Sequence, residues 1–332
     1  MINEILESIA SKKRILILTH NNPDPDAMAS AFGLKHLLNQ TYRRKKITIA
    51  YMGMVGRLEN RELVKQCKID MQHSFGLDFR RFDHIIVVDT QPSAGNVYIS
   101  KGVCVNTIID HHIIKRNIPK RKDLIMDIRP LYGSTCTIIA EYYKMLGFTP
   151  DTNTATALCY GISSDTIGKA RDNNSVDRQM MGFLFPYLSI RKLGKIENPE
   201  LPRYHFKTLR RAIENAIIIN ELLFCDISEV RNSDLIAEAA DYFTRMREIR
   251  CVFVIGKFDN VAFFSLRYKS TKKSVGRVAM KIVKGMGYGG GHIQSAGGQI
   301  PLTNRDYAET IAVLKSRTLK YLGINSIEEK PI

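Results

Sequence analysis

A set of acidic and imidazole side chains in the first half of the sequence could bind metal ions. Carboxylate and imidazole ligands together suit Mn²⁺ or a similar divalent ion better than a structural zinc ion, which favours thiolates. Two ions need roughly six or seven protein ligands, one of them a bridging carboxylate. The set supplies that number, and it consists of His20, Asp24, Asp26, Asp89, His111 and Asp165. A pair of ions roughly 3.5–4 Å apart hydrolyses phosphate esters, because it activates a water molecule near neutral pH. The sequence therefore predicts a phosphoesterase.

Several of these ligands stand directly after short apolar runs that are typical of buried strands. His20, Asp89 and the segment Asp110–His112 each follow such a run. In an open parallel sheet, ligands bind beyond the carboxyl ends of the strands, so three such endings converge on one edge. One ending could be an ordinary polar residue after a strand. Three endings of metal-ligand type are much harder to explain by chance.

The loop after the first run places one histidine and two aspartates within seven residues. Pro23 and Pro25 fix backbone angles there and hold Asp24 and Asp26 ahead of a helix. That helix is expected to begin near Asp26, and its N-terminus carries a positive partial charge that suits a phosphate. A helix cap would explain one aspartate, but not both aspartates together with His20.

Strand and helix patterns alternate through this half of the chain. We expect strands at residues 14–19, 47–51, 84–89, 106–110 and 124–128. We expect helices at residues 26–40, 134–146, 152–163 and 175–188. Such alternation predicts an α/β fold with an open parallel sheet sandwiched by helices.

The length of 332 residues favours two domains. Proline and glycine gather between residues 186 and 202, so we place a first domain at residues 1–188, a linker at 189–204 and a second domain at 205–325. The second domain is a smaller α/β unit with expected helices at 204–215, 233–247, 275–284 and 305–322. It also contains an apolar run at 216–225, a strand pair at 251–255 and 261–268, and a Gly-rich loop followed by a short strand.

Composition adds weaker constraints. The net charge of +16 fits a polyanionic partner, and it fits equally well a general excess of Lys and Arg. The six cysteines form no Cys-x-x-Cys pair, which argues against a zinc ribbon and a disulfide framework. We expect reduced thiols, no signal peptide, no membrane contact and a cytoplasmic location.

The motifs in this order resemble those of the DHH phosphoesterase family. They are His-x-x-Pro-Asp-x-Asp from His20, a strand-end aspartate, Asp-His-His from Asp110 and a later aspartate. In the second half, Gly289-Gly290-Gly291-His292 and the following Ala-Gly-Gly at 296–298 resemble the signature of the DHH-associated domain. The resemblance covers nearly the whole chain.

The resemblance implies a role for each site residue. His20, Asp24 and Asp89 would bind one ion. Asp26, Asp89, His111 and Asp165 would bind the other, with Asp89 as the bridge. His112 would lie near the scissile phosphate as a donor or general acid, and Asp110 would orient the histidine pair. Ala29 stands where many relatives carry glycine, and we expect this to alter helix packing only slightly.

The same resemblance implies substrate-binding residues in the second half. The amides of Gly290 and Gly291 could bind phosphate, and His292 could contact a phosphate or a base. Arg267 resembles the family's substrate-phosphate arginine, and its fork of donors fits a phosphate. The remaining histidines have no motif context.

The branch of the family that the chain resembles is the bifunctional oligoribonuclease and 3′-phosphoadenosine 5′-phosphate phosphatase. It implies two divalent ions, Mn²⁺ first and Mg²⁺ as the alternative, an active site in a cleft between the domains, short RNA substrates and a homodimer. Three other hydrolases stay open: a cyclic- or linear-dinucleotide phosphodiesterase, a RecJ-like single-strand exonuclease and a family-two inorganic pyrophosphatase, against which the Gly-Gly-His motif argues. A non-catalytic nucleic-acid-binding module is the alternative outside the enzymes.

Overall fold

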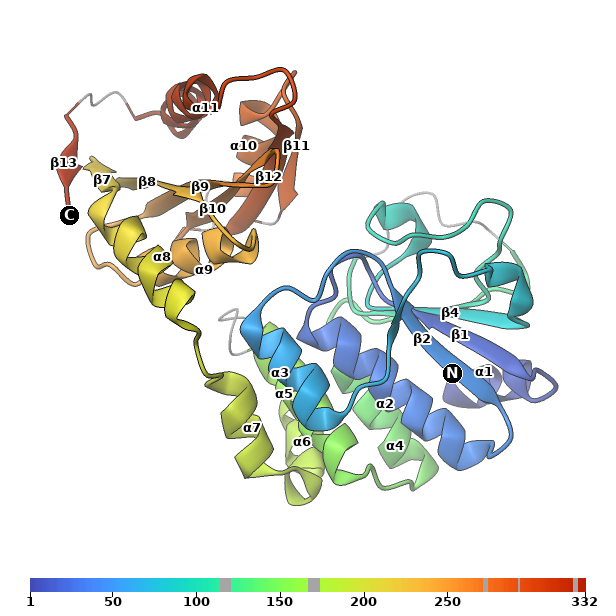
Figure 1. The fold of residues 1–332 in the computed structure, drawn as a ribbon. Coiled ribbons are helices and arrows are strands. Elements are labelled where there is room, and N and C mark those ends of the chain that lie inside the picture. Colours follow the sequence, from blue (N-terminus) through green and yellow to red (C-terminus); the bar gives the residue numbers. More distant parts are fainter. Residues whose placement is uncertain (114–120, 167–173, 271–273, 292, 325–327) are drawn as a thin grey trace. The chain divides into compact units, whose positions relative to one another are not determined.

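The computed structural model describes residues 1–113, 121–166, 174–270, 274–291, 293–324 and 328–332. The chain forms two compact units, Met1–Pro199 and Glu200–Ile332 (Figure 1). The stretch expected to link the domains contains helix α7 (Ile190–Glu197), and α7 packs on helices of the first unit. The boundary between the units therefore follows α7.

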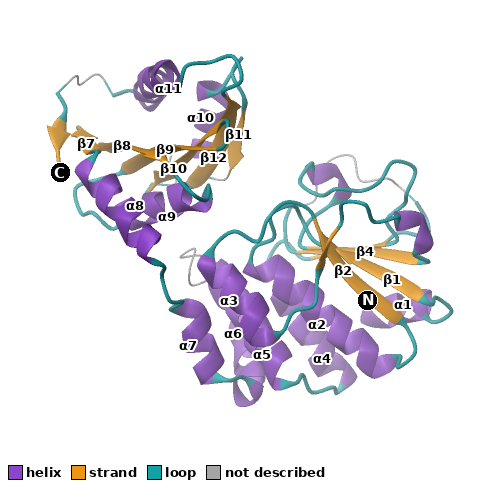
Figure 2. Cartoon of the chain, in the orientation of Figure 1, coloured by secondary structure: helices purple, strands orange, loops and turns teal. Residues whose placement is uncertain are grey.

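The first unit is built on a six-stranded sheet in which all paired strands are parallel (Figure 2). The strands lie in the order β3-β2-β1-β4-β5-β6. Their bounds are Arg14–Leu18 (β1), Lys46–Tyr51 (β2), Gln72–His73 (β3), His84–Val88 (β4), Thr107–Asp110 (β5) and Ile125–Ile128 (β6). The predicted parallel α/β architecture is confirmed. Because the strands are parallel, the ends of β1, β4 and β5 lie at the same edge.

The helices of the first unit share one large apolar core with one side of this sheet. They are α1 (Ile2–Ile9), α2 (Pro25–Thr41), α3 (Leu58–Cys67), α4 (Thr135–Leu146), α5 (Thr152–Thr166), α6 (Ser175–Leu184) and α7, with short 3₁₀ turns at Phe79–Arg81 (η1), Pro92–Ala94 (η2) and Phe185–Tyr187 (η3). The opposite side, represented by Leu16, Leu18 and Val87, packs beneath Phe79 and Val105 in a smaller core.

Small residues let α2 and α5 approach closely. A Cβ atom on Gly161 would lie 2.4 Å from Cys136 Sγ and 3.2 Å from Ala29 Cβ, and one on Gly33 would lie 2.8 Å from Leu158 Cδ2. Gly161 also faces the backbone of Pro25, so the C-terminal turns of α5 lie beside the N-terminus of α2. This packing brings Asp165 on α5 toward the loop that follows β1.

The second unit contains a seven-stranded mixed sheet in the order β11-β12-β10-β9-β8-β7-β13. The strands are Ala216–Ile219 (β7), Leu222–Glu229 (β8), Cys251–Phe258 (β9), Val261–Tyr268 (β10), Tyr288–Gly291 (β11), Ser295–Pro301 (β12) and Lys330–Pro331 (β13). Its helices are α8 (Arg203–Glu214), α9 (Asp234–Phe243), α10 (Val275–Ile282) and α11 (Tyr307–Leu322). Helices α8 and α9 share one apolar core with the sheet, and α10 and α11 share the other.

Two segments of this unit differ from the sequence-based expectation. The apolar run at 216–225 is not one segment but part of a hairpin, in which β7 and β8 pair around Asn220, whose φ is 56°. The Gly-rich run is not a loop: Gly289–Gly291 form most of β11 and pair with β12. A Cβ atom on Gly298 of β12 would lie 2.4 Å from Phe264 Cε1, so close sheet packing explains that glycine.

The sequence-based analysis missed α1, α3, α7 and β3 in the first unit. None of the helices in the described ranges is both long and apolar enough to span a membrane.

The buried His84 at the start of β4 makes stability depend on pH. Burial, with a smaller contribution from the charge of Lys12, lowers the pKa of His84 to about 4. Its Nε2 lies 2.9 Å from Thr107 Oγ1. Because an unfolded histidine has a pKa of about 6.5, the unfolded chain binds more protons between these values, and stability falls as pH falls.

We therefore expect the free energy of unfolding to drop by up to about 1.4 kcal/mol per pH unit between pH 6.5 and 4 through this group. Urea titrations of wild type and His84→Gln at pH 7 and pH 5 measure it. The wild type should lose more stability than the variant between the two pH values. Equal losses would contradict the account.

Candidate metal centre

The predicted metal ligands come together at the carboxyl edge of the first sheet. Three groups of side chains place one ligand atom each within 4.8 Å of the others. The groups are His20, Asp24 and Asp89; Asp26, His111 and Asp165; and Asp89, His111 and His112. The loop after β1 contributes His20 and Asp24, α2 contributes Asp26, and α5 contributes Asp165. The convergence of strand ends and two helix ends therefore assembles all six predicted ligands.

Asp89 belongs to two of these groups, the one with His20 and Asp24 and the one with His111 and His112. It follows β4 with a positive φ of 57°, a conformation that side chains other than Asn, Asp and Gly adopt at some cost. Its amide donates to Ile109 O at 2.9 Å, so the neighbouring strand fixes the turn. Its Oδ2 lies 3.6 Å from His20 Nε2 and its Oδ1 lies 3.5 Å from His111 Nε2. The carboxylate thus has one oxygen beside each half of the cluster, as a bridging ligand requires.

The two histidines of the cluster present the same nitrogen to the carboxylates. His20 Nδ1 lies 3.0 Å from Asn21 O, and His111 Nδ1 lies 3.1 Å from Tyr132 O. A carbonyl oxygen only accepts, so each Nδ1 carries a proton, and the neutral form of each ring has its lone pair on Nε2.

The Nε2 atom of His111 is buried without a hydrogen-bond partner among the described residues. It lies 3.5–3.8 Å from oxygens of Asp26, Asp89 and Asp165. A lone pair surrounded by carboxylate oxygens is unfavourable unless a cation lies between them, so this donor set fits a divalent metal ion.

The N-terminus of α4 holds two of the carboxylates. The amides of Thr135 and Cys136 donate to Asp26, each at 2.8 Å, and Thr135 Oγ1 donates to Asp89 Oδ1 at 2.9 Å. Asp26 is fully buried, so these bonds offset part of its desolvation. Sequence reasoning missed Thr135, because a threonine at a helix start is ordinarily taken as part of a cap.

The acidic side chains repel one another where they gather. Burial, and then the charge of Asp165, raise the pKa of Asp26 to about 7. Burial, and then the charge of Asp26, raise the pKa of Asp89 to about 7. A bound divalent ion reverses the sign of this local field and favours the ionised form of both groups. The electrostatics of the cluster, like its geometry, therefore favour a bound divalent ion.

His112 is oriented differently from the other two histidines. Its Nδ1 lies 2.8 Å from Asp110 Oδ1, and Gln91 Nε2 donates to Asp110 Oδ2 at 2.7 Å. Burial alone would lower the pKa of His112, but the bond to Asp110 and the charge of Asp89 outweigh it and raise that pKa to about 9. Asp110 thus positions His112, whereas Tyr132 positions His111. The sequence-based analysis assigned both histidines to Asp110 and missed Gln91.

The residues predicted to bind substrate lie in the second unit. The guanidinium of Arg267 on β10 makes hydrogen bonds within the second unit. Its Nε donates to Asp241 Oδ1 and its Nη1 donates to Ser265 Oγ, both at 2.6 Å. In β11, a Cβ atom on Gly290 would meet nothing within 4 Å, whereas one on Gly291 would lie 2.4 Å from Ser295 O. Gly290 therefore borders open space, whereas the backbone of β12 leaves no room for a side chain at Gly291. His292 lies outside the described residues.

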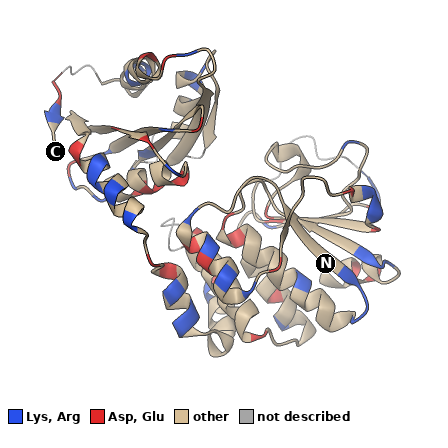
Figure 3. Cartoon of the chain, in the orientation of Figure 1, with Lys and Arg blue, Asp and Glu red and all other residues tan. Residues whose placement is uncertain are grey.

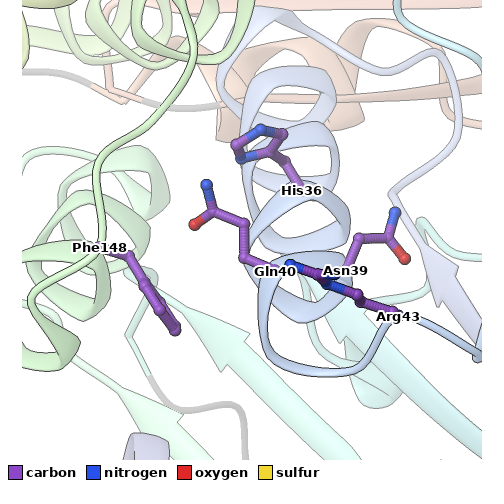
Figure 4. A pocket seen from close by; sticks show the side chains of 5 residues that line it. All are labelled: His36, Asn39, Gln40, Arg43 and Phe148. Atoms are coloured by element: carbon purple, nitrogen blue, oxygen red, sulfur yellow. The ribbon is translucent and has the colours of Figure 1, made fainter.

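A shallow pocket of about 470 Å³ lies beside the C-terminal half of α2 (Figure 4). Its lining residues are His36, Asn39, Gln40, Arg43 and Phe148. Arg43 follows the C-terminal end of α2, and His36 is ten residues beyond Asp26, or roughly 15 Å along the helix axis. This pocket is therefore separate from the metal centre.

The positive charge of the chain is spread over both units. Figure 3 shows Lys and Arg on α7 and other parts of the first unit, and along α8 of the second unit. This distribution identifies no single element as the binding surface for a polyanion.

Two segments of the chain match models of known families. Residues 14–162 match the family described as DHH family, N-terminal domain. Residues 217–317 match the DHHA1 domain. The first match falls within the first compact unit and the second within the second.

Two curated relatives show how far the similarity extends. An uncharacterised protein of Methanocaldococcus jannaschii is 33% identical over 300 residues, which cover 90% of this chain and 60% of that protein. A protein of Streptococcus suis described as a probable manganese-dependent inorganic pyrophosphatase is 26% identical over 168 residues, or 46% of this chain and 49% of its own length. The chain thus spans about half to three fifths of these relatives.

One solved structure is similar over most of the chain. An exopolyphosphatase-related protein from Bacteroides fragilis superposes with a TM-score of 0.75 at 16% identity, covering 96% of each chain. At that level of identity, the likeness shows a shared fold.

The contacts of Thr135 predict that its hydroxyl supports metal binding. Thr135→Val removes the bond to Asp89 and keeps the helix, so we expect the affinity for Mn²⁺ to fall about 10- to 100-fold. Thr135→Ser keeps the hydroxyl and should bind nearly as tightly as wild type. Isothermal titration of the three proteins with Mn²⁺ measures this, and equal affinities for Val and Ser variants would rule out the role.

Proposed function

The chain belongs to the DHH family, and on that basis we propose that it hydrolyses phosphoester bonds in short oligoribonucleotides with two divalent ions, Mn²⁺ in the first place. The 3′-phosphate of 3′-phosphoadenosine 5′-phosphate is a second substrate in this proposal. The observation that carries it is the pair of imidazole Nε2 atoms, on His20 and His111, that face a shared carboxylate on Asp89.

The proposed ligand sets follow from the distances. His20, Asp24 and Asp89 would hold one ion, and Asp26, Asp89, His111 and Asp165 would hold the other. When bound, such a pair of ions supplies an activated water molecule and neutralises charge on the phosphoryl oxygens. The name of the Streptococcus suis relative supports manganese as the metal.

The other residues of the first unit would then position the substrate and move a proton. With a pKa raised to about 9, His112 is charged near neutral pH and can donate a proton to the leaving oxygen. Asp110 binds Nδ1 of this ring, so Nε2 is the nitrogen left for the substrate. Gln91 in turn fixes the second oxygen of Asp110, which keeps the donor in one orientation.

We assign the choice of substrate to the second unit. Arg267, with its Nε and Nη1 held by Asp241 and Ser265, is a fixed cation that suits a substrate phosphate. Gly290 borders open space in the edge strand β11, so its backbone can be approached closely. Gly291, and His292 next to it in the sequence, complete the proposed binding residues.

Inorganic pyrophosphate is the alternative to these nucleotide substrates. The similarity to the probable pyrophosphatase favours it, but that similarity spans 46% of this chain. The Gly-Gly-His sequence at 290–292 argues against it, because it lies within the DHHA1 match at residues 217–317 and resembles the signature of that domain. Pyrophosphate and nucleotides therefore belong in the same assay.

A substrate panel tests the proposal. With Mn²⁺, the protein should hydrolyse a dinucleotide and a five-nucleotide RNA faster than a long single strand, a cyclic dinucleotide or pyrophosphate, and it should release phosphate from 3′-phosphoadenosine 5′-phosphate. Absence of hydrolysis in every sample would refute a catalytic function and favour a binding module. Faster turnover of the long strand would favour an exonuclease.

Asp89→Asn provides the active-site control for this panel. Asparagine tolerates the positive φ at this position, so the fold should persist, but the neutral side chain cannot bridge two cations. We expect kcat to fall by at least about a thousandfold. Asp70→Asn, at an exposed side chain on the surface, should behave as wild type. Activity of the Asp89 variant within tenfold of wild type would contradict the bridging role.

Arg267→Gln tests the second unit. Loss of the guanidinium should raise KM for the dinucleotide about tenfold or more and leave Mn²⁺ affinity unchanged, because no predicted metal ligand belongs to this unit. Arg250→Gln, at an exposed arginine paired with Glu221, is the matched control. A drop in Mn²⁺ affinity in the Arg267 variant would exclude the assignment.

A further inference from the structure

We propose that Tyr51, His73 and Phe75 form an aromatic platform on which a nucleobase of the substrate stacks. The proposal rests on the proposed function and deepens it, because it identifies part of the substrate as a base rather than a bare phosphate. The three residues belong to none of the catalytic motifs.

The three rings form a continuous series. The centroids of Tyr51 and His73 lie 5.6 Å apart with an edge-to-face angle of 80°, and those of His73 and Phe75 lie 6.5 Å apart at 54°. Such arrangements are favourable between aromatic rings. The Tyr51 ring is partly buried, His73 is exposed, and Phe75 is 82% exposed. The series therefore ends in a phenyl ring that has most of its surface open to solvent.

Backbone contacts hold the platform in place. The amide of Ser74 donates to Tyr51 O at 2.7 Å, and the amide of Phe75 donates to His73 Nδ1 at 3.2 Å. Tyr51 and His73 are direct partners in the parallel pairing of β2 and β3. Because these bonds fix the backbone that carries the rings, less chain freedom is lost when a base stacks on them, and binding is stronger for that reason.

The platform lies at the same edge of the sheet as the metal centre. β2 pairs with β1, and β3 pairs with β2, so Tyr51 and His73 end strands that run parallel to the one before His20. With neighbouring strands about 4.8 Å apart, β3 lies roughly 10 Å from β1. Stacked nucleotides rise about 3.4 Å each, so a base within about three nucleotides of the scissile phosphate can reach the platform.

A direct connection joins the platform's strand to the metal-binding loop. The amide of Asn22 donates to Met52 O at 2.8 Å, and Asn22 Oδ1 accepts from the amide of Met54 at 2.9 Å. Met54 in this segment is 49% exposed. The segment after β2 is thus fixed to the loop that carries His20 and Asp24.

A nucleobase suits this surface better than another protein does. An exposed phenyl ring and a site for phosphate esters on the same sheet edge match the base and the phosphate of a nucleotide. A phenyl ring can stack on any base, so this contact requires no particular nucleotide sequence. The net charge of +16 attracts a polyanionic strand.

A double-mutant cycle tests the platform. The ligands are a trinucleotide RNA and the same trinucleotide with one terminal base removed, so that their charges match. Binding is measured by fluorescence anisotropy with Ca²⁺ in place of Mn²⁺, and turnover is measured separately with Mn²⁺. We expect Phe75→Ala to weaken binding of the full trinucleotide about tenfold, and to weaken binding of the abasic ligand much less. Phe75→Tyr should restore the affinity.

Phe185→Ala is the control, since Phe185 in η3 is 61% exposed but belongs to no ring series. Equal effects of Phe75→Ala on both ligands, or no effect on either, would overturn the proposal. An altered sedimentation profile with unchanged RNA binding would assign the surface to a second copy and would also overturn it. Failure of turnover with every substrate would refute the proposed function, while the binding ratio still decides the platform.

Discussion

The gathering of four carboxylates around two imidazole lone pairs is the constraint on which the rest of the structure depends. Burial of the carboxylates, and then the repulsion between their like charges, raises the pKa values of Asp26 and Asp89 to about 7. The fold counters it with fixed donors: two amides at the start of α4 and the hydroxyl of Thr135. Two of the oxygens that accept these bonds, Asp26 Oδ2 and Asp89 Oδ1, also lie 3.8 and 3.5 Å from His111 Nε2, where a cation would bind.

Elements far apart in the sequence must meet for this cluster to exist. The parallel sheet brings the ends of β1, β4 and β5 to one edge, and the close packing of α2 against α5 adds Asp26 and Asp165. Gly33, Gly161 and Ala29 permit that packing, which explains why a small residue at position 29 preserves the arrangement. The positive φ of Asp89 then gives its two oxygens to the two halves of the cluster. The backbone conformation of Asp89 and the packing of α2 on α5 thus both contribute to the metal centre.

The amino-acid sequence predicted the parallel fold and the candidate metal ligands. Apolar runs that end in Asp or His indicate both a buried strand and the side chains that follow its carboxyl end. It did not reveal Thr135 or Gln91, whose roles arise from contacts with Asp89 and Asp110 across the fold. It read the glycines of β11 as a loop, because glycine is common in turns, whereas tight pairing with β12 selects them here. The ring series from Tyr51 to Phe75 was also invisible, since β3 has two residues and no strand signal.

The central claim is that two divalent ions occupy this cluster and share Asp89. The most direct test is an anomalous difference map, recorded at the manganese absorption edge, from crystals of the protein grown with Mn²⁺. The account predicts two peaks roughly 3.5–4 Å apart, with the Asp89 carboxylate between them and His20 and His111 on opposite sides. A single peak, or peaks remote from Asp89, would contradict it.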